Sequence, residues 1–156
     1  MAAPSARPET APLDPGLLGL AVWAFLAATI LPLASEPLAV GLVAAGRGVV
    51  EVWAAATLGN VAGSVVNWWV GRAAAGLADR GRLPVSRAAL ARAETWFGRF
   101  GRPVLLLAWL PVVGDALTIV AGLLRTPLGP FLLLVGLGKG ARYALVLAPT
   151  GALFAD

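Results

Sequence analysis

The chain has 156 residues, of which 59% are hydrophobic and 13% are charged. Soluble domains are about half apolar and about a quarter charged, so this composition excludes an ordinary soluble domain and indicates an integral membrane protein with one compact domain. The net charge of +4 comes from twelve Lys and Arg residues set against eight acids; in a membrane protein such charge bears on topology and anionic lipid, and we expect no nucleic-acid partner.

Histidine and cysteine are both absent from the sequence. Their absence removes the commonest metal ligand, the commonest general base, and all disulfide and thiolate chemistry. No pairing of a nucleophile with a base is visible among the other residues. We therefore expect no enzymatic activity, no metal site and no other cofactor.

The distribution of prolines and apolar residues predicts three regions. Residues 1–15 carry prolines among small and polar residues and lack the cationic start of a secretory signal, which is typical of a flexible tail. Residues 16–149 are predicted to form a single membrane domain. Residues 150–156 are predicted to be a short tail.

The first part of the membrane domain, residues 16–47, is longer than the roughly 20 residues that one crossing requires. Its interior is apolar apart from Ser35 and Glu36, and Pro32 and Pro37 bracket the acid. Two half-helices that meet at a proline-containing turn fit this pattern better than one tilted helix. We predict a re-entrant hairpin over 16–47.

Residues 49–71 are predicted to form a full transmembrane helix. Small and polar residues recur in it at spacings of three and four: Gly59, Asn60, Gly63, Ser64 and Asn67. This spacing places them on one helical face, as close helix packing or a polar lining requires. For the two asparagines, interhelical hydrogen bonding and substrate contact are equally supported. Trp68 and Trp69, followed by Arg72, indicate an interfacial end.

Residues 73–101 are predicted to leave the membrane as a basic cytoplasmic segment. Ser86 is a suitable N-cap for a helix that continues through Phe100. The apolar residues of this helix recur at spacings of three and four: Leu90, Ala93, Trp96, Phe97 and Phe100. Arginines lie off this stripe, so we predict an interfacial amphipathic helix in the headgroup plane.

Residues 103–125 are apolar enough for a membrane, yet they carry Pro111, Gly114 and Asp115 at their middle. A lipid-spanning helix does not usually combine a helix breaker with a carboxylate, and irregular backbone at membrane depth needs protein or a wet cavity around it. We predict a second re-entrant hairpin. A hairpin returns Arg125 to the side of the arginine-rich segment, as the positive-inside rule prefers; a straight crossing would place it opposite.

Residues 128–148 are predicted to be the last transmembrane helix, with Lys139 and Arg142 inside it on one face. A shift of 79 residues aligns the two halves of the chain: Leu31-Pro32 with Leu110-Pro111, Glu36 with Asp115, and Leu58-Gly59-Asn60 with Leu137-Gly138-Lys139. If 49–71 crosses once, the second unit is inverted. The predicted fold is an all-α integral membrane protein with two oppositely oriented re-entrant helical hairpins, each followed by a transmembrane helix, plus an interfacial amphipathic helix.

Five motifs connect the chain to a known family. They are Leu-Pro-Leu-Ala-Ser-Glu-Pro at 31–37, Ala-Thr-Leu-Gly-Asn-Val-Ala-Gly-Ser-Val-Val-Asn-Trp at 56–68, Trp-Leu-Pro-Val-Val-Gly-Asp at 109–115, Ala-Gly-Leu-Leu-Arg-Thr-Pro at 121–127, and Gly-Lys-Gly-Ala-Arg-Tyr at 138–143. On these motifs the chain resembles the DedA superfamily, and within it the YqaA-like branch. The resemblance implies two oppositely oriented re-entrant hairpins and the movement of phospholipids or polyprenyl-phosphate carriers between leaflets.

The resemblance also implies functional acids in the first hairpin and functional arginines around the second. The better-studied members carry an arginine shortly before and another shortly after the proline of the second hairpin. This chain has Ala108 and Gly114 near those places, with Asp115 next door, and its nearest membrane-embedded cations are Lys139 and Arg142. Since arginine is the best holder of an anionic headgroup, the departure concerns the substrate more than the mechanism.

Candidate site residues follow from charge and polarity at membrane depth. The candidate substrate- or proton-binding residues are Glu36, Asp115, Lys139, Arg142, Asn60, Asn67, Thr118 and Tyr143, and the candidate hairpin turns are Pro32, Pro37, Pro111 and Gly114. Each charge costs about 2.5 to 3.5 kcal/mol at the centre of a membrane helix. The acids are read either as a proton-responsive pair that faces a shared cavity or as helix caps at a wet surface. The cations either pair with these acids or hold a phosphate headgroup.

The leading functional hypothesis is lipid transport between leaflets of a bacterial-type cytoplasmic (inner) membrane, in the manner of a flippase or scramblase. The expected partners are membrane lipids with anionic headgroups, with protons as coupling ions. A chain with so few spans is also compatible with a homodimer. Two alternatives stay open: a membrane scaffold or assembly factor without a transported substrate, and a proton-coupled small-solute transporter.

Overall fold

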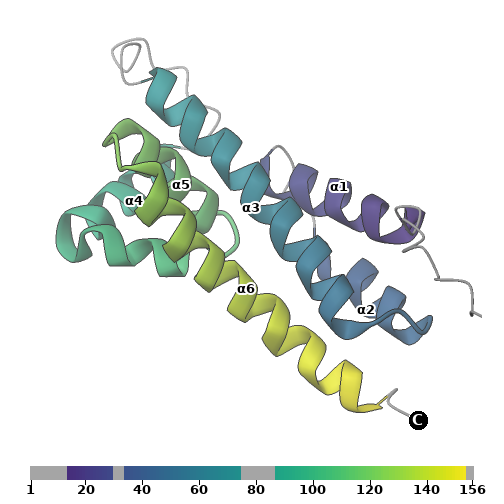
Figure 1. Ribbon diagram of the computed structural model, residues 1–156. Helices are drawn as coiled ribbons and strands as arrows, with labels where there is room; N and C mark the ends of the chain where they lie inside the picture. Colours follow the sequence, from purple (N-terminus) through teal and green to yellow (C-terminus); the bar gives the residue numbers. More distant parts are fainter. Residues whose placement is uncertain (1–13, 30–33, 75–86, 154–156) are drawn as a thin grey trace, which may run out of the picture.

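The computed structural model describes residues 14–29, 34–74 and 87–153. Its helices in chain order are α1 (Pro15–Thr29), α2 (Glu36–Ala44), α3 (Val49–Ala74), α4 (Arg87–Phe100), η2 (Arg102–Leu107), α5 (Val113–Leu123) and α6 (Leu128–Leu153) (Figure 1). The described residues contain no strand, which confirms the all-α prediction. Within the segment predicted as the second hairpin, the part before the turn is a 3₁₀-helix, η2, rather than an α-helix.

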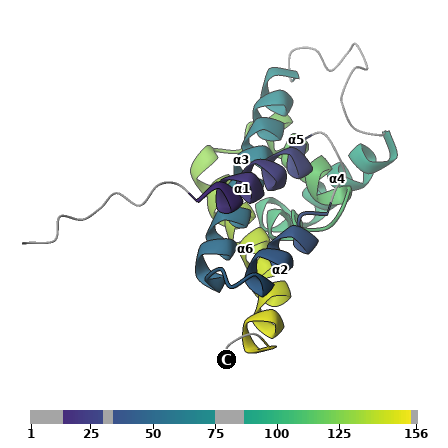
Figure 2. The same cartoon turned by 90° about the vertical axis from the view of Figure 1, so that its right-hand side faces the viewer.

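Two long helices form the centre of the molecule. α3 and α6 each have 26 residues, which at about 1.5 Å per residue gives a length of about 39 Å. Both are apolar enough to cross the hydrocarbon core of a membrane, which is about 30 Å thick. They pack against each other and run in opposite directions. α1 and α2 lie towards one side of this pair and α4 and α5 towards the other in Figure 1, and the turned view of Figure 2 brings α1 and α2 to the front.

The short helices α2 and α5 end in the same way. Gly46, with φ 86°, follows the end of α2, and Arg125, with φ 52°, follows the end of α5. The next amide in each case donates back to a carbonyl five residues earlier, with a distance of 3.0 Å from Arg47 N to Leu42 O and of 2.9 Å from Thr126 N to Ala121 O. This is the Schellman pattern. Each helix therefore ends in a left-handed residue that turns the chain into the long helix that follows.

The crossing of α3 and α5 depends on glycine. A Cβ built at Gly71 would lie 2.0 Å from the carbonyl oxygen of Ile119, and one at Gly122 would lie 2.0 Å from that of Trp68. The two backbones are therefore in direct contact. The small-residue face predicted for α3 is also packed: Gly59, Gly63, Ser64 and Asn67 are buried and Asn60 is half-buried.

Two apolar clusters make the core. One joins the C-terminal half of α3 to α4, η2, α5 and the start of α6, and includes Trp68, Phe97 and Phe131. The other joins α1 and α2 to the start of α3 and the later part of α6, and includes Val52 and Leu147. Each long helix therefore begins in one cluster and ends in the other.

Trp68 corrects an expectation from the sequence. Its ring is buried in the first cluster, 6.1 Å from the ring of Phe131, and its Nε1 donates to the carbonyl of Thr126 at 3.0 Å. The prediction that Trp68 is an interfacial anchor is wrong, because α3 continues to Ala74 and this face meets the loop between α5 and α6. Trp69 points outward and is exposed.

The amphipathic helix is present as α4, and its apolar stripe is divided. Ala93 and Phe97 are buried against the first cluster, whereas Phe100 is exposed. Part of the stripe predicted to face lipid headgroups therefore packs on the protein itself, because α5 and η2 offer it an apolar surface. The expected cap, Ser86, lies outside the described residues.

Candidate functional site

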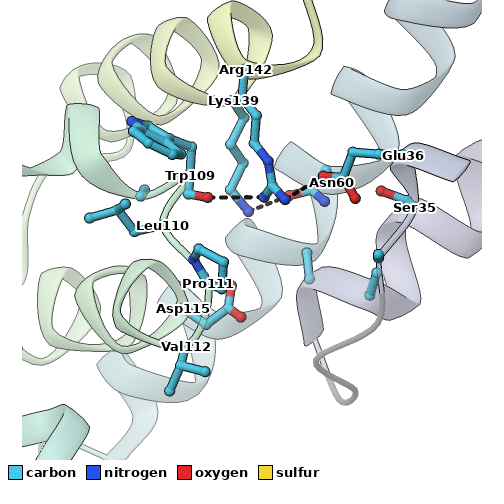
Figure 3. A pocket seen from close by; sticks show the side chains of 14 residues that line it. Ser35, Glu36, Asn60, Trp109, Leu110, Pro111, Val112, Asp115, Lys139 and Arg142 are labelled. Atoms are coloured by element: carbon cyan, nitrogen blue, oxygen red, sulfur yellow. Dashed lines mark hydrogen bonds and ion pairs between the residues drawn. The ribbon is translucent and has the colours of Figure 1, made fainter. Parts of the chain in front are cut away.

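A polar cavity of about 140 Å³ lies where the two apolar clusters meet. Its polar side chains come from four helices and the residue before one of them: Ser35, Glu36, Asn60, Asp115, Lys139 and Arg142. Figure 3 shows Lys139 and Arg142 reaching into it from α6, with Asp115 on the opposite side. Four of the six are charged groups from the sequence-predicted set.

A repeat of four residues on α6 explains why the cavity lies at this level. Phe131 and Val135 belong to the first cluster, and Tyr143 and Leu147 to the second. Lys139 lies midway on the same stripe, since residues four apart share a helical face. Asn60 occupies the corresponding place on α3, between Ala56 in the second cluster and Trp68 in the first. The polar layer is thus the level at which the apolar stripes of both long helices are interrupted.

Arg142 connects distant parts of the chain. Its guanidinium forms an ion pair with Glu36 at the start of α2, and its Nη1 donates to the carbonyl oxygen of Trp109 at 2.9 Å. Trp109 belongs to the turn between η2 and α5. The Arg142 side chain therefore links the start of α2, in the first half of the chain, to the turn before α5, in the second half. Both members of the ion pair keep partial exposure.

Lys139 is 4% exposed and belongs to a chain of polar contacts. Its ammonium donates to Oδ1 of Asn60, and Nδ2 of Asn60 donates to the hydroxyl of Tyr143 at 3.1 Å. That hydroxyl shares a 2.5 Å hydrogen bond with the hydroxyl of Ser35. The neutral contacts hold the ammonium in position without cancelling its charge. Asp115 lines the same cavity, and it has no ion pair within the described part of the chain.

The remaining candidates lie elsewhere. Asn67 is buried and its Nδ2 donates to the carbonyl of Ala28 at 2.8 Å, so it joins α3 to α1. Thr118 is buried in α5, where its hydroxyl donates to the carbonyl of Asp115 at 2.7 Å. Neither side chain lines the cavity. Tyr143 is joined to it only through the contacts of its hydroxyl.

The predicted turn residues are placed differently from one another. Pro111 lines the cavity, and Pro37 lies in the first turn of α2. Gly114, in the first turn of α5, donates its amide to the carbonyl of Leu110 at 2.8 Å. Pro32 lies outside the described residues.

Three features of the site were not predicted from the sequence. Ser35 lines the cavity and shares a hydrogen bond with Tyr143, and its polarity within an apolar segment is the only sequence signal for this role. Trp109 contributes a backbone carbonyl, which no side-chain pattern reveals. Val112, on the cavity edge, has φ 64°, a conformation that is rare and costly for a β-branched residue. Among the described residues no group of His, Cys, Asp or Glu could hold a metal ion.

Comparison with known proteins identifies the family. The VTT domain family matches residues 31–150, which include all six polar residues of the cavity. The chain belongs to the VTT domain family. The resemblance to the DedA superfamily and its YqaA-like branch is confirmed.

Three relatives support this assignment. Inner membrane protein YqaA of Escherichia coli strain K12 is 35% identical over 139 residues, which cover 86% of this chain and 90% of that protein, and the Shigella flexneri protein of the same name matches equally. An uncharacterized protein of Haemophilus influenzae is 33% identical over 132 residues, 80% of each chain. No solved structure matches the chain. Together with its two long apolar helices, these matches make this member of the VTT domain family an inner-membrane protein.

Proposed function

We propose that this protein moves lipids with anionic headgroups, phospholipids or polyprenyl phosphates, between the leaflets of the inner membrane. The observation that carries the proposal is the polar cavity between two apolar clusters, which gathers Glu36, Asp115, Lys139 and Arg142. Charged side chains at membrane depth are costly, and in membrane proteins they commonly mark the path of a substrate or a proton.

The proposal includes an inverted repeat, in which 16–47 and 103–125 are oppositely oriented re-entrant hairpins. A shift of 79 residues carries the bounds of α3 onto those of α6, and the end of α2 onto the end of α5. The long helices run in opposite directions. Lys139 and Asn60, which the same shift relates, are hydrogen-bonded to each other. Equivalent residues of two inverted units touch only near the axis that relates the units, so this contact supports such an axis through the cavity.

In this mechanism the two cations hold the phosphate and the two acids govern when they do so. Arginine binds phosphate through a planar fork of donors and lysine as a point charge. Glu36 competes with the phosphate for Arg142. Protonation of Glu36 removes this competition and raises the net charge of the cavity by one, which favours an anion. Lipid binding would thereby be coupled to proton uptake.

Lipid movement in proteoliposomes tests the proposal. Wild-type protein is compared with Glu36→Gln and Asp115→Asn at pH 6 and pH 8, using a fluorescent phosphatidylglycerol whose outer-leaflet fraction is quenched chemically. Leu133→Ala, on the exposed outer face of α6, is the matched control. We expect wild type and control to transfer lipid with a pH dependence that both acid variants lose. Absence of transfer by folded wild-type protein would contradict the proposal.

A scaffold or assembly role is the second candidate, because the same polar groups also join distant helices. Arg142 links α6 to α2 and to the turn before α5, and Lys139 links α6 to α3. If these contacts only stabilise the fold, replacing both Glu36 and Arg142 by glutamine should restore what either single change loses. A third candidate, a proton-coupled solute transporter, would instead show a substrate-dependent pH change in vesicles.

A further inference from the structure

A second hollow lies beside the polar cavity on the outer face of η2 and α6, and we call it the lateral groove. Its volume is about 720 Å³, a size found among small-molecule sites, which span about 300 to 1,000 Å³. Its apolar walls are Leu106, Leu107, Trp109, Leu137, Leu145 and Val146. Trp109 and Arg142 line both hollows, so the groove and the polar cavity lie side by side.

The groove is formed by the close approach of η2 to α6. A Cβ built at Gly138 would lie 2.4 Å from the carbonyl oxygen of Leu106, so only glycine allows this contact. Ala141, about one turn further along α6, also lines the groove, and its short side chain leaves the groove open there. Leu137 and Leu145 stand on either side and remain exposed, Leu145 at 77%. The result is an apolar groove on the outer face of α6 with Arg142 in its lining.

We propose that the lateral groove holds one acyl chain of an anionic phospholipid whose phosphate enters the polar cavity beside Arg142. This inference rests on the proposed function and adds a binding site for the part of the substrate that the polar cavity cannot accept. The partly exposed charge of Arg142 borders both hollows, where a phosphate joined to an acyl chain would place its own charge. A long polyprenyl chain would extend well beyond a groove of this size.

The physical reason for such a groove is the covalent link between headgroup and chain. A headgroup can reach a polar cavity inside the membrane only if its chain has an apolar exit to the bilayer. A small hydrophilic solute needs no such exit. Since the chain moves between two apolar environments, the groove gains no hydrophobic free energy from it. Selectivity must then come from the headgroup, while the groove sets the path.

Photo-crosslinking tests occupancy independently of transport. Protein in vesicles of phosphatidylethanolamine and phosphatidylglycerol is illuminated with a phosphatidylglycerol that carries a diazirine in its acyl chain, and adducts are mapped by mass spectrometry. We expect adducts to concentrate on 106–109 and 137–146 and to fall with excess unlabelled phosphatidylglycerol. Equal labelling at Leu58 and Leu133, which are 70% and 63% exposed on the long helices, would mean ordinary surrounding lipid and would overturn the inference. The inference would also be overturned if a polyprenyl phosphate reduced the labelling and unlabelled phosphatidylglycerol did not.

Filling the groove tests its use in transport. Ala141→Trp is compared with Leu133→Trp, and thermal melting in detergent confirms that both variants fold. Because the indole would occupy the space proposed for the acyl chain, we expect Ala141→Trp to lower the transfer rate about tenfold, which corresponds to about 1.4 kcal/mol, with the control unchanged. If wild type transfers lipid and Ala141→Trp does so equally well, the groove inference fails while the proposed function stands. If folded wild type transfers nothing, the proposed function itself fails, and the adduct map still decides occupancy.

A second copy of the chain is the remaining occupant to exclude. The sequence has no cysteine, so Leu145→Cys introduces a single thiol at the edge of the groove. We expect this variant to remain monomeric on mild oxidation in vesicles. Efficient disulfide dimerisation through Leu145→Cys, with none for Leu133→Cys, would show that the groove is a subunit interface and would overturn the inference.

Discussion

The two long helices are alike in build and differ in what they place at their middle. α3 and α6 have the same length, and each passes from one apolar cluster to the other. At the polar level α3 presents Asn60, whereas α6 presents Lys139 and, three residues later, Arg142. α6 therefore supplies both cations of the site. The two helices thus have the same length and different side chains at the polar level. Where their equivalent positions meet, the neutral Asn60 accepts a hydrogen bond from Lys139, because two cations would repel.

The two acids differ in a similar way. Glu36 is ion-paired with Arg142, whereas Asp115 lines the same cavity with no ion pair within the described residues. One carboxylate is thus held by a specific partner, and we propose that the other meets an incoming proton or cation. Their separate replacement should distinguish a structural contribution from a functional one.

The largest loss of stability is expected when Asn60 of α3 receives the charge that Lys139 carries on α6. Asn60→Lys would place a second ammonium against Lys139, and a buried charge without a partner costs about 3 to 5 kcal/mol. We expect a strong loss of thermal stability in detergent. Asn60→Asp, which offers Lys139 a counter-ion, is the matched control and should retain the fold. Equal melting temperatures for Asn60→Lys and wild type would mean that the side chains at positions 60 and 139 do not face each other.

The second largest loss of stability is expected at the close crossing of α3 and α5. Gly71→Leu would force apart the backbones of α3 and α5, and we expect a loss of about 3 kcal/mol, the top of the usual range for overpacking. Gly136 of α6, which has open space where its Cβ would stand, provides the control Gly136→Leu. Unfolding curves in denaturant compare the two. A smaller loss for Gly71→Leu than for Gly136→Leu would contradict the close crossing.

A moderate loss of stability is expected from replacing Glu36, and a smaller one from replacing Asp115. Glu36→Gln leaves Arg142 without its ionic partner, and a hydrogen bond to a charged group contributes about 1.5 to 3 kcal/mol. Asp115→Asn breaks no ion pair among the described residues and should change stability less. The double variant Glu36→Gln with Arg142→Gln should recover part of the loss, by about 1 kcal/mol in a double-mutant cycle. Equal destabilisation by the two acid variants would remove the distinction.

The smallest effect separates the two helix caps. Gly46 and Arg125 both have positive φ, but only glycine adopts this conformation without strain. Arg125→Gly should raise stability by about 1 kcal/mol and Gly46→Ala should lower it by a similar amount. Thermal melting of the two variants gives the comparison. A gain of stability from Gly46→Ala would show that the cap is not left-handed.

Much of the architecture could be predicted because it depends on local pattern. Composition indicated a membrane protein, periodicity indicated the long helices and the packed small-residue face of α3, and the motifs indicated the family, which the comparisons confirm. The four charged residues of the cavity stood out because charge is rare in apolar sequence. The hairpins and the inverted repeat stay predictions, since they describe the chain relative to a bilayer.

The sequence by itself determined which residues are unusual, and the tertiary structure decided what each one does. Asn60 and Asn67 share a pattern, yet one contacts Lys139 in the cavity and the other joins α3 to α1. Trp68 reads as an anchor and is core, while the site uses a carbonyl from Trp109. The physical reason is that a side chain's role depends on its partner, and here the two residues of a contact lie 33 to 108 positions apart in the chain.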